Sequence, residues 1–174
     1  MSEVRDITDL ERLDARIGDA AARAVSAIRR ILADGDPLEV LARVRFHAVG
    51  FHPVSGDVLN LIEQINQTFT CLAVTRAARW ILHRYPESTP LLLNLAERGG
   101  CDIKSENGLV AAEVFAAVDP ANNGKLQKDI EKVARVQAVH RYVFYVCPSH
   151  PCAEPRAATD HPEVKVVSLG PHTA

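Results

Sequence analysis

The chain has 174 residues, of which 47% are hydrophobic and 24% are charged, and its formal net charge is −2. This length and hydrophobic content are enough to bury the core of one domain, which we expect to span residues 1–174. The near-neutral charge excludes bulk attraction to nucleic acid, so a basic surface would have to be local. No run approaches the roughly 18 apolar residues of a membrane span, and residues 1–6 are too polar for a secretory signal. We therefore expect a cytoplasmic protein without membrane contact.

Residues 4–33 are predicted to form a long N-terminal helix. Apolar residues recur there at spacings of three and four with charged residues between them, as in an amphipathic helix. The positions are Val4, Ile7, Leu10, Leu13, Ile17, Ala24, Ile28 and Ile31. The apolar stripe is narrow, so the helix could pack on its own domain or supply the seam of a homodimer. The sequence leaves both arrangements open.

The next part of the chain is mixed. Residues 38–51 are ambiguous, and residues 44–51 within them could form a short strand or an irregular connection. A second helix is expected from residue 57 to about residue 84, because Ser55-Gly56-Asp57 resembles an N-cap and helical apolar spacing follows it. Glu63 lies near the beginning of this helix, beside the apolar stripe.

The hydrophobic period then changes to that of strands. Residues 91–95 form a short apolar run, and residues 101–105 and 109–118 flank Asn107-Gly108. An Asn-Gly pair between two such runs is the strongest short signal for a hairpin, because both residues accept a positive φ. In that register Lys104 lies opposite Ala111, and Asp102 lies opposite Glu113.

The remaining elements complete an α/β fold. We predict a helix at 125–137, a strand at 141–146, and a Pro-rich loop with a final strand within 147–174. A strand, a helix and a second strand in this order form a parallel βαβ unit. The expected architecture is a mixed central sheet with helices on both faces, plus the long N-terminal helix.

The pairing of Asp102 with Glu113 points to a metal. Directly opposed residues share one face of a hairpin, with Cβ atoms roughly 4.5–5.5 Å apart. Two carboxylates held this close repel each other unless a cation, a proton or a basic group lies between them. Oxygen ligands favour Mg²⁺ or Mn²⁺ over zinc. We therefore predict a divalent metal site at these two residues.

The helix at 125–137 carries a basic stripe along one edge, formed by Lys125, Lys128, Lys132 and Arg135. Helical geometry places these four side chains within about 80° of arc. The stripe could be an ordinary solvated edge, or it could contact the phosphates of DNA without reading sequence. The helix follows the strand of Glu113, so its first turn could bring Lys125 toward the carboxylates.

With these residues in place, the segment 57–146 resembles the PD-(D/E)XK nuclease superfamily, the restriction-endonuclease-like fold. The shared features are the element order α-β-β-β-α-β, Asp102 on the second strand, and Ala111-Ala112-Glu113-Val114-Phe115 as the third-strand motif. The resemblance implies hydrolysis of DNA phosphodiesters with Mg²⁺ or Mn²⁺ bound by Asp102 and Glu113. Glu63 would be the family's acidic residue on the first helix.

One position departs from the family pattern. The motif lysine is replaced by Phe115, whose ring cannot orient or polarise a water molecule. Lys125 is the first substitute and Lys104 the second. In the implied reaction the metal lowers the pKa of the attacking water, and the lysine offsets charge that develops on the phosphate.

Two other interpretations remain open. The same fold could serve as a catalytically silent nucleic-acid-binding or assembly module, or Lys104 could neutralise a purely structural acid pair. Cys147, His150 and Cys152 could bind a soft metal, but they lack a second Cys/His pair at zinc spacing. His140, just before a predicted strand, is more simply a structural histidine than a catalytic one.

Overall fold

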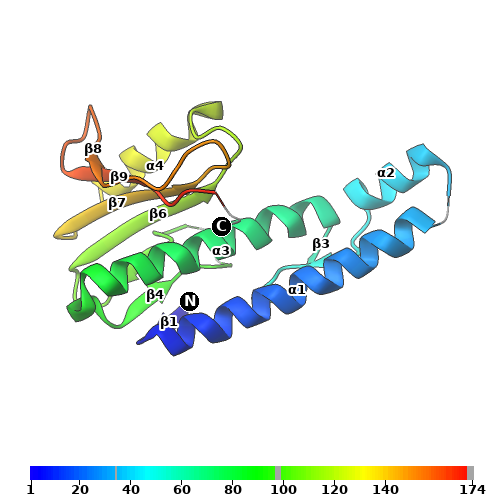
Figure 1. Ribbon diagram of the computed structural model, residues 1–174, viewed down its shortest axis with the longest axis horizontal. Coiled ribbons are helices and arrows are strands. Elements are labelled where there is room, and N and C mark those ends of the chain that lie inside the picture. The colour runs from blue at the N-terminus through cyan, green and yellow to red at the C-terminus, as the bar shows by residue number, and fades with distance from the viewer. Residues whose placement is uncertain (34, 97–98, 172–174) are drawn as a thin grey trace. The chain divides into compact units, whose positions relative to one another are not determined.

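The computed structural model describes residues 1–33, 35–96 and 99–171, drawn in Figure 1. The chain divides into two compact units, one formed by residues 1–10 and 73–174 and the other by residues 11–72. That residues 1–174 form a single domain stays a prediction. The last three residues of the segment expected at 147–174 lie outside the described residues.

The larger unit is built on a seven-stranded mixed sheet, which confirms the α/β class. The strands from β1 to β6 in sheet order pair antiparallel, whereas β6, β7 and β9 run parallel and β8 closes the edge antiparallel. In sheet order they are β1 (Ser2–Val4), β4 (Leu91–Leu93), β5 (Ile103–Ser105), β6 (Val110–Ala116), β7 (His140–Val146), β9 (Val164–Ser168) and β8 (Arg156–Ala157).

Helices cover both faces of this sheet (Figure 1). Helix α4 (Lys125–Ala134) links β6 to β7, and its Ile130 and Val133 pack in one cluster with Phe115. On the other face lies the second half of α3 (Leu61–Arg84), where the Trp80 ring meets the rings of Tyr142 and Phe144 edge-on at 5.3 and 5.2 Å. Strand residues alternate between the two faces, so β6 and β7 are buried on both sides.

The first element corrects the expected helix at 4–33. Val4 belongs to β1 and pairs with Leu91, so the sheet takes the first apolar residue of the pattern. Helix α1 (Ile7–Ala33) begins after Asp6, whose carboxylate accepts the N–H of Asp9 at 3.1 Å. Such a bond satisfies one of the N–H groups that a helix start leaves unpaired.

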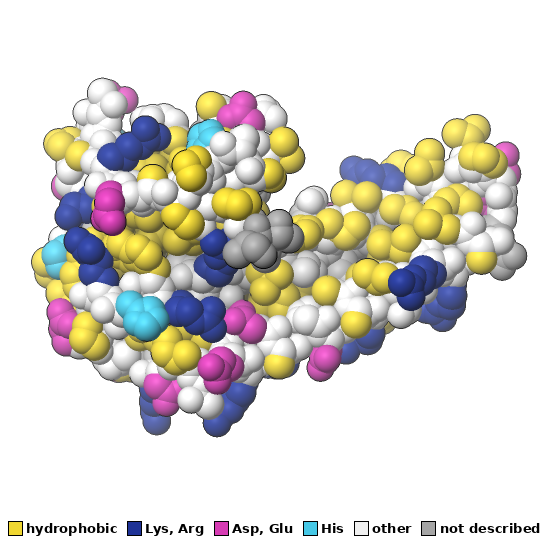
Figure 2. Space-filling view, in the orientation of Figure 1, with side chains coloured by type: hydrophobic (Ala, Val, Ile, Leu, Met, Phe, Trp, Pro, Cys, Tyr) yellow, Lys and Arg dark blue, Asp and Glu magenta, His cyan; other side chains and the backbone are white. Residues whose placement is uncertain are grey.

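The smaller unit contains most of α1, then α2 (Pro37–Phe46), the hairpin of β2 (Gly50–Phe51) and β3 (Val58–Leu59), and the first half of α3. One of its buried clusters contains Ala24, Ala27 and Leu61, with Ile28, Ile31 and Val44 packed against it. Leu13, Ile17 and Ala20 of α1 are buried as well. Figure 2 shows many hydrophobic side chains on its visible surface.

Two boundaries in this unit differ from expectation. The ambiguous segment at 38–51 begins with α2, which starts at Pro37 because Asp36 caps it through the N–H groups of Leu38 and Glu39. The second helix begins at Leu61 rather than at residue 57, because Asn60 rather than Ser55 or Asp57 accepts the N–H of Glu63, at 2.8 Å.

Short elements complete the larger unit. Single 3₁₀ turns occur at Pro86–Ser88 and Asn122–Gly124, and the helix expected at 125–137 ends at Ala134. Strand β8 was not expected, since it is only two exposed residues long within the Pro-rich loop. Among the described residues, no helix has the length and apolar content needed to cross a membrane.

Candidate active site

The hairpin of β5 and β6 has the expected register, with Lys104 paired to Ala111 and Ile103 to Ala112. The ladder ends at that pair, and Asp102 lies one residue before it with its carboxylate bonded to the N–H of Val114, the residue after Glu113. The turn itself differs from expectation, because Gly108 has a positive φ of 72° and Asn107 does not. The N–H of Gly108 donates to the carbonyl of Ser105 at 3.2 Å, so a turn of a different type holds the same register.

Glu113 is the central residue of the site. It lies in the middle of β6, on the face that α4 covers, and only 1% of its surface is exposed. Its Oε2 accepts a hydrogen bond from the Nζ of Lys132 at 2.7 Å, whereas its Oε1 is buried without a hydrogen-bond partner. Burial and the nearby charge of Asp102 raise the pKa of Glu113 to about 7, although Lys132 opposes this shift.

Asp102 lies just before β5 and ties the hairpin together. Its Oδ2 accepts the backbone N–H of Val114 at 2.7 Å. Burial raises the pKa of Asp102, while that hydrogen bond and the charges of Lys132 and Lys125 act in the opposite direction. Both acids therefore lie within one electrostatic cluster at the α4 face of the sheet.

Lys132 supplies the cation of this cluster. It was expected to contact DNA phosphate, but its ammonium binds Glu113 directly, and its side chain remains 45% exposed. Although burial lowers the pKa of Lys132, the hydrogen bond and charge of Glu113 and the charge of Asp102 raise it overall. Lys132 is thus a firmly protonated group that reaches from solvent into the acid pair.

Lys125, the first expected substitute for the motif lysine, is held differently. Its Nζ donates to Oδ1 of Asp129 at 2.7 Å and lies 5.7 Å from the centre of the Phe115 ring. The ammonium therefore sits over the side chain that replaces the motif lysine, as a cation–π contact. It is not bonded to either strand carboxylate, yet its charge acts on Asp102.

Asp129 is a site residue that the sequence analysis missed. It is 3% exposed, its Oδ1 binds Lys125, and its Oδ2 is buried without a hydrogen-bond partner. Its charge raises the pKa of both Asp102 and Glu113. A signal was present, because Asp129 lies three residues after Leu126 and four before Val133, on the apolar stripe of the helix.

The remaining predicted residues lie apart from the acids. Lys104 is exposed and, among the described residues, forms no ion pair with Asp102 or Glu113. Lys128 is exposed on α4 and donates to the carbonyl of Asn123 at 3.3 Å, and Arg135 is exposed at the C-cap of this helix. Glu63 is exposed in the other compact unit, so it is not placed relative to this site.

The acidic side chains of the site meet some of the requirements for binding a divalent cation weakly. Within the described ranges, no three His, Cys, Asp or Glu side chains are grouped as a metal cage. Yet an unbonded buried oxygen on Glu113 and another on Asp129 are hard donors without a partner. Mg²⁺ is commonly bound by one or two carboxylates plus waters and substrate phosphate. Asp102 and Glu113 meet that lower requirement.

The cysteine-rich loop does not form a site in the described residues. The thiol of buried Cys147 donates to the carbonyl of Val118, His150 bonds to the hydroxyl of Tyr145, and the thiol of Cys152 donates to Leu169. Each potential ligand thus has its own partner. His140 stacks on the ring of Tyr85 at 4.6 Å, in keeping with a structural role.

Comparison with known proteins adds no family. No family model matches the chain, and neither the curated proteins nor the solved structures gave a significant match.

Proposed function

We propose that this chain is a metal-dependent phosphodiesterase of the restriction-endonuclease-like, PD-(D/E)XK type that acts on DNA. The order of elements supports the proposal. Helix α3 is followed by the antiparallel strands β4, β5 and β6, then by α4 and the parallel strand β7. This is the α-β-β-β-α-β order of that fold, with Glu113 on the third of these strands and Asp102 just before the second.

One observation carries the proposal. Glu113 is 1% exposed, with one oxygen bound to Lys132 and the other unbonded. A buried carboxylate that is left half unsatisfied costs free energy, and structural acids are normally fully hydrogen-bonded. A charged cluster with an open acceptor, beside a second acid and a lysine, is typical of a catalytic site.

The residues have separate roles in the proposed reaction. Asp102 and Glu113 would hold Mg²⁺ or Mn²⁺, which as a Lewis acid would supply activation of the attacking water. The water oxygen would form a new bond to phosphorus and lose its proton to solvent, while the ester P–O bond would break and the leaving oxygen would take a proton from solvent. Lys132 keeps Glu113 in one orientation, and the ammonium groups of Lys132 and Lys125 offset charge on the phosphate.

Lys132 takes the role first assigned to Lys125 and Lys104. It approaches Glu113 from the helix rather than from the same strand, and its raised pKa keeps it cationic. Lys128 on the same helix and Arg135 at its C-cap, both exposed, would contact DNA phosphates on either side.

Plasmid nicking tests the proposal. Wild-type protein with Mg²⁺ or Mn²⁺ is expected to convert supercoiled plasmid to the nicked form, whereas Glu113→Gln and Lys132→Met lose at least 100-fold in rate. Glu131→Gln is the matched control, because Glu131 is on the same helix and only contacts Gln127 at 3.4 Å. Equal rates for Glu113→Gln and Glu131→Gln would contradict the assignment.

Metal binding is measured separately from cleavage. Mn²⁺ is expected to raise the melting temperature of wild type and of Glu131→Gln, but not that of Asp102→Asn. The wild-type shift should shrink below pH 7, because protons compete for Glu113. A shift that persists in Asp102→Asn would place the metal elsewhere.

A catalytically silent nucleic-acid-binding or assembly module is the second candidate, and Phe115 favours it. The ring occupies the motif lysine position under Lys125, and Lys132 already occupies one oxygen of Glu113. A module of this kind would bind DNA and show no nicking by wild type with either metal.

We also propose that the protein is a homodimer. Val25 and Leu32 are 47% and 64% exposed and lie seven residues apart, on one face of α1. Sedimentation should give a dimer mass for wild type and a monomer mass for Val25→Asp/Leu32→Asp. If this double variant is still a dimer, Val25 and Leu32 are not part of the interface.

A further inference from the structure

A groove in the smaller unit lies outside the candidate active site. A cavity of about 320 Å³ lies between α1 and the β2–β3 hairpin, lined by Arg23, Ser26, Arg30, Phe51 and Gln64 among others. A second hollow of about 300 Å³ shares Arg30 and Val49 with it and adds Arg43. The two hollows adjoin through these shared residues, so together they form an extended groove.

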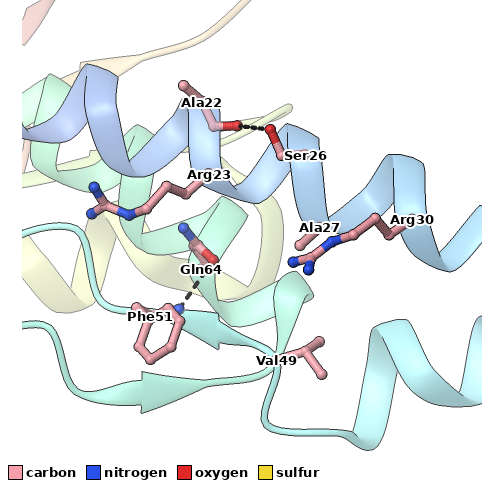
Figure 3. A pocket seen from close by; sticks show the side chains of 8 residues that line it. All are labelled: Ala22, Arg23, Ser26, Ala27, Arg30, Val49, Phe51 and Gln64. Carbon is pink, nitrogen blue, oxygen red and sulfur yellow. Dashed lines mark hydrogen bonds between the residues drawn. The ribbon is translucent and has the colours of Figure 1, made fainter.

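Two arginines in this groove have no ion-pair partner among the described residues. Arg23 and Arg30 project from one side of α1, with the Gln64 side chain between their guanidinium groups (Figure 3). Within the part of the chain that the structure describes, neither side chain forms an ion pair or a hydrogen bond. The stretch of α1 from residue 20 to residue 33 contains no acidic residue. The groove is therefore locally basic in a chain of net charge −2.

The groove also has an exposed apolar wall. The ring of Phe51 is 44% exposed and Val49 is 38% exposed. A flat aromatic ring beside arginines is the combination found in proteins that bind single-stranded nucleic acid, where bases stack and phosphates meet the cations.

The wall is held in place by a buried polar side chain. Gln64 is 2% exposed, accepts the N–H of Phe51 at 3.0 Å, and donates to the carbonyl of Ala20 at 3.0 Å. Gly50 permits this close approach, because a Cβ there would lie 2.6 Å from Oε1 of Gln64. The hairpin is thus fastened to both helices, and the groove is preformed.

We infer that this groove binds single-stranded nucleic acid, with Arg23 and Arg30 on backbone phosphates and Phe51 stacked on a base. The inference goes beyond the proposed function, because the groove lies outside the candidate active site and its ligand is tested without cleavage. Helical rise separates the Cα atoms of Arg23 and Arg30 by about 10 Å, which suits two phosphates of one strand. A duplex presents only base edges in its grooves, so an exposed ring fits unpaired bases.

Binding without cleavage gives the first test. Fluorescence anisotropy of a labelled 15-nucleotide oligothymidylate is measured with full-length protein in EDTA. Arg23→Ala/Arg30→Ala is expected to weaken binding at least tenfold, and to reduce the slope of log K against log salt by about 1.4, as for two lost phosphate contacts.

Arg29→Ala is the matched control, since Arg29 is exposed on α1 and does not line the groove. Its affinity should stay within about threefold of wild type. Equal losses for Arg29→Ala and the double variant would overturn the inference, because they would reflect overall charge alone.

A second test examines the base contact. Phe51→Ala is expected to weaken oligothymidylate binding by about tenfold, the lower range for one stacked base. An abasic oligonucleotide should bind wild type and Phe51→Ala equally. Phe46→Ala, which removes a ring that is 75% exposed, serves as control. Equal effects of Phe51→Ala on both oligonucleotides would overturn the stacking role.

Competition experiments show which class of ligand binds in the groove. Unlabelled oligothymidylate should displace the probe. A poly-aspartate peptide or a duplex of equal charge should need at least a tenfold higher concentration for the same displacement. Equal competition by either one would overturn the inference. Because these measurements contain EDTA, absent plasmid nicking with intact groove binding would contradict the proposed hydrolysis alone.

Discussion

The two compact units differ in where they keep their charged and apolar side chains. In the sheet unit, Glu113 and Asp129 are 1% and 3% exposed, and lysines reach in to pair with them. In the unit of residues 11–72, α2 has no buried residue, and Arg23 and Arg30 face solvent. Ten large apolar side chains are exposed there: Val25, Leu32, Leu38, Leu41, Phe46, Val49, Phe51, Val58, Ile62 and Phe69.

This contrast separates two ways of building a binding surface. The sheet unit places charge inside a packed frame, where ion pairs and hydrogen bonds fix the position of each group. The helical unit instead exposes many of its large apolar side chains, which a binding partner could cover. Substitutions should therefore change folding in the first unit and association in the second.

Phe144→Ala should have the largest effect on stability. Phe144 is fully buried, meets Trp80 edge-on, and stacks on Tyr142 at 5.3 Å. Truncation leaves a cavity, and we expect a loss of about 4 kcal/mol in the free energy of unfolding. Urea unfolding measures it. A loss below about 1 kcal/mol would show that the sheet unit is not the better packed one.

Lys132→Met should come next, at about 3 kcal/mol at pH 8. The substitution leaves the buried Glu113 carboxylate without its cation, which is costlier than removing both partners. Adding Glu113→Gln should therefore restore most of the loss. Lys128→Met is the control and should stay within about 0.5 kcal/mol, because Lys128 is exposed. An equal loss in the double variant would mean that the pair is not coupled.

Stability should change by about 2.5 kcal/mol between pH 5 and pH 8, because the pKa shift of Glu113 corresponds to about 3.5 kcal/mol over the full range, at about 1.4 kcal/mol per unit, and this window covers most of it. Burial and Asp102 raise the pKa of Glu113 from 4.5 to about 7. Between these values the folded protein holds a proton that the unfolded chain has released. The contribution of Glu113 to stability is therefore full below about pH 4.5 and is lost as the pH rises to 7.

Urea unfolding in EDTA from pH 5 to pH 8 would show this as a gap between wild type and Glu113→Gln. Wild type should lose stability relative to Glu113→Gln as the pH increases. A gap that moves in the opposite direction would mean that the pairing with Lys132 outweighs burial.

Leu41→Ser should have the smallest effect, within about 0.5 kcal/mol. Leu41 is 63% exposed on α2, so its side chain loses little burial when it is replaced. Differential scanning calorimetry at low concentration measures it. A large loss would show that α2 is covered in the free protein, and that the contrast between the units is weaker than described.

Local chemistry explains which parts of the structure the sequence could predict. The register of the hairpin followed from Asn107-Gly108 and the alternating strands, and it holds although the turn type differs. The parallel βαβ unit followed from the spacing of strand, helix and strand. Helix α2 was missed because it buries no side chain and so shows no clear period, although Asp36-Pro37 marked its start.

The candidate site was predicted less completely. The two strand acids follow from register, but the choice of lysine depends on how deeply α4 docks on the sheet. Lys125 and Lys132 share one stripe, and two turns of helix decide which of them reaches Glu113. Asp129 lies on the apolar stripe of α4, where an acidic residue indicates a buried partner. The arginine groove could not be predicted, because it joins α1 to a hairpin whose first strand was ambiguous and whose second strand was expected to be the start of a helix.

The three acids of the cluster divide their oxygens in the same way. In each, one oxygen has a partner: Val114 for Asp102, Lys132 for Glu113, and Lys125 for Asp129. That bond fixes the rotamer, so the second oxygen points in one direction only. An amide in any of these places would have to turn its NH₂ either toward the anchoring donor or outward. Replacing one of these acids by asparagine or glutamine therefore changes which group faces outward as well as the charge. An outward NH₂ would repel a cation that the native oxygen attracts.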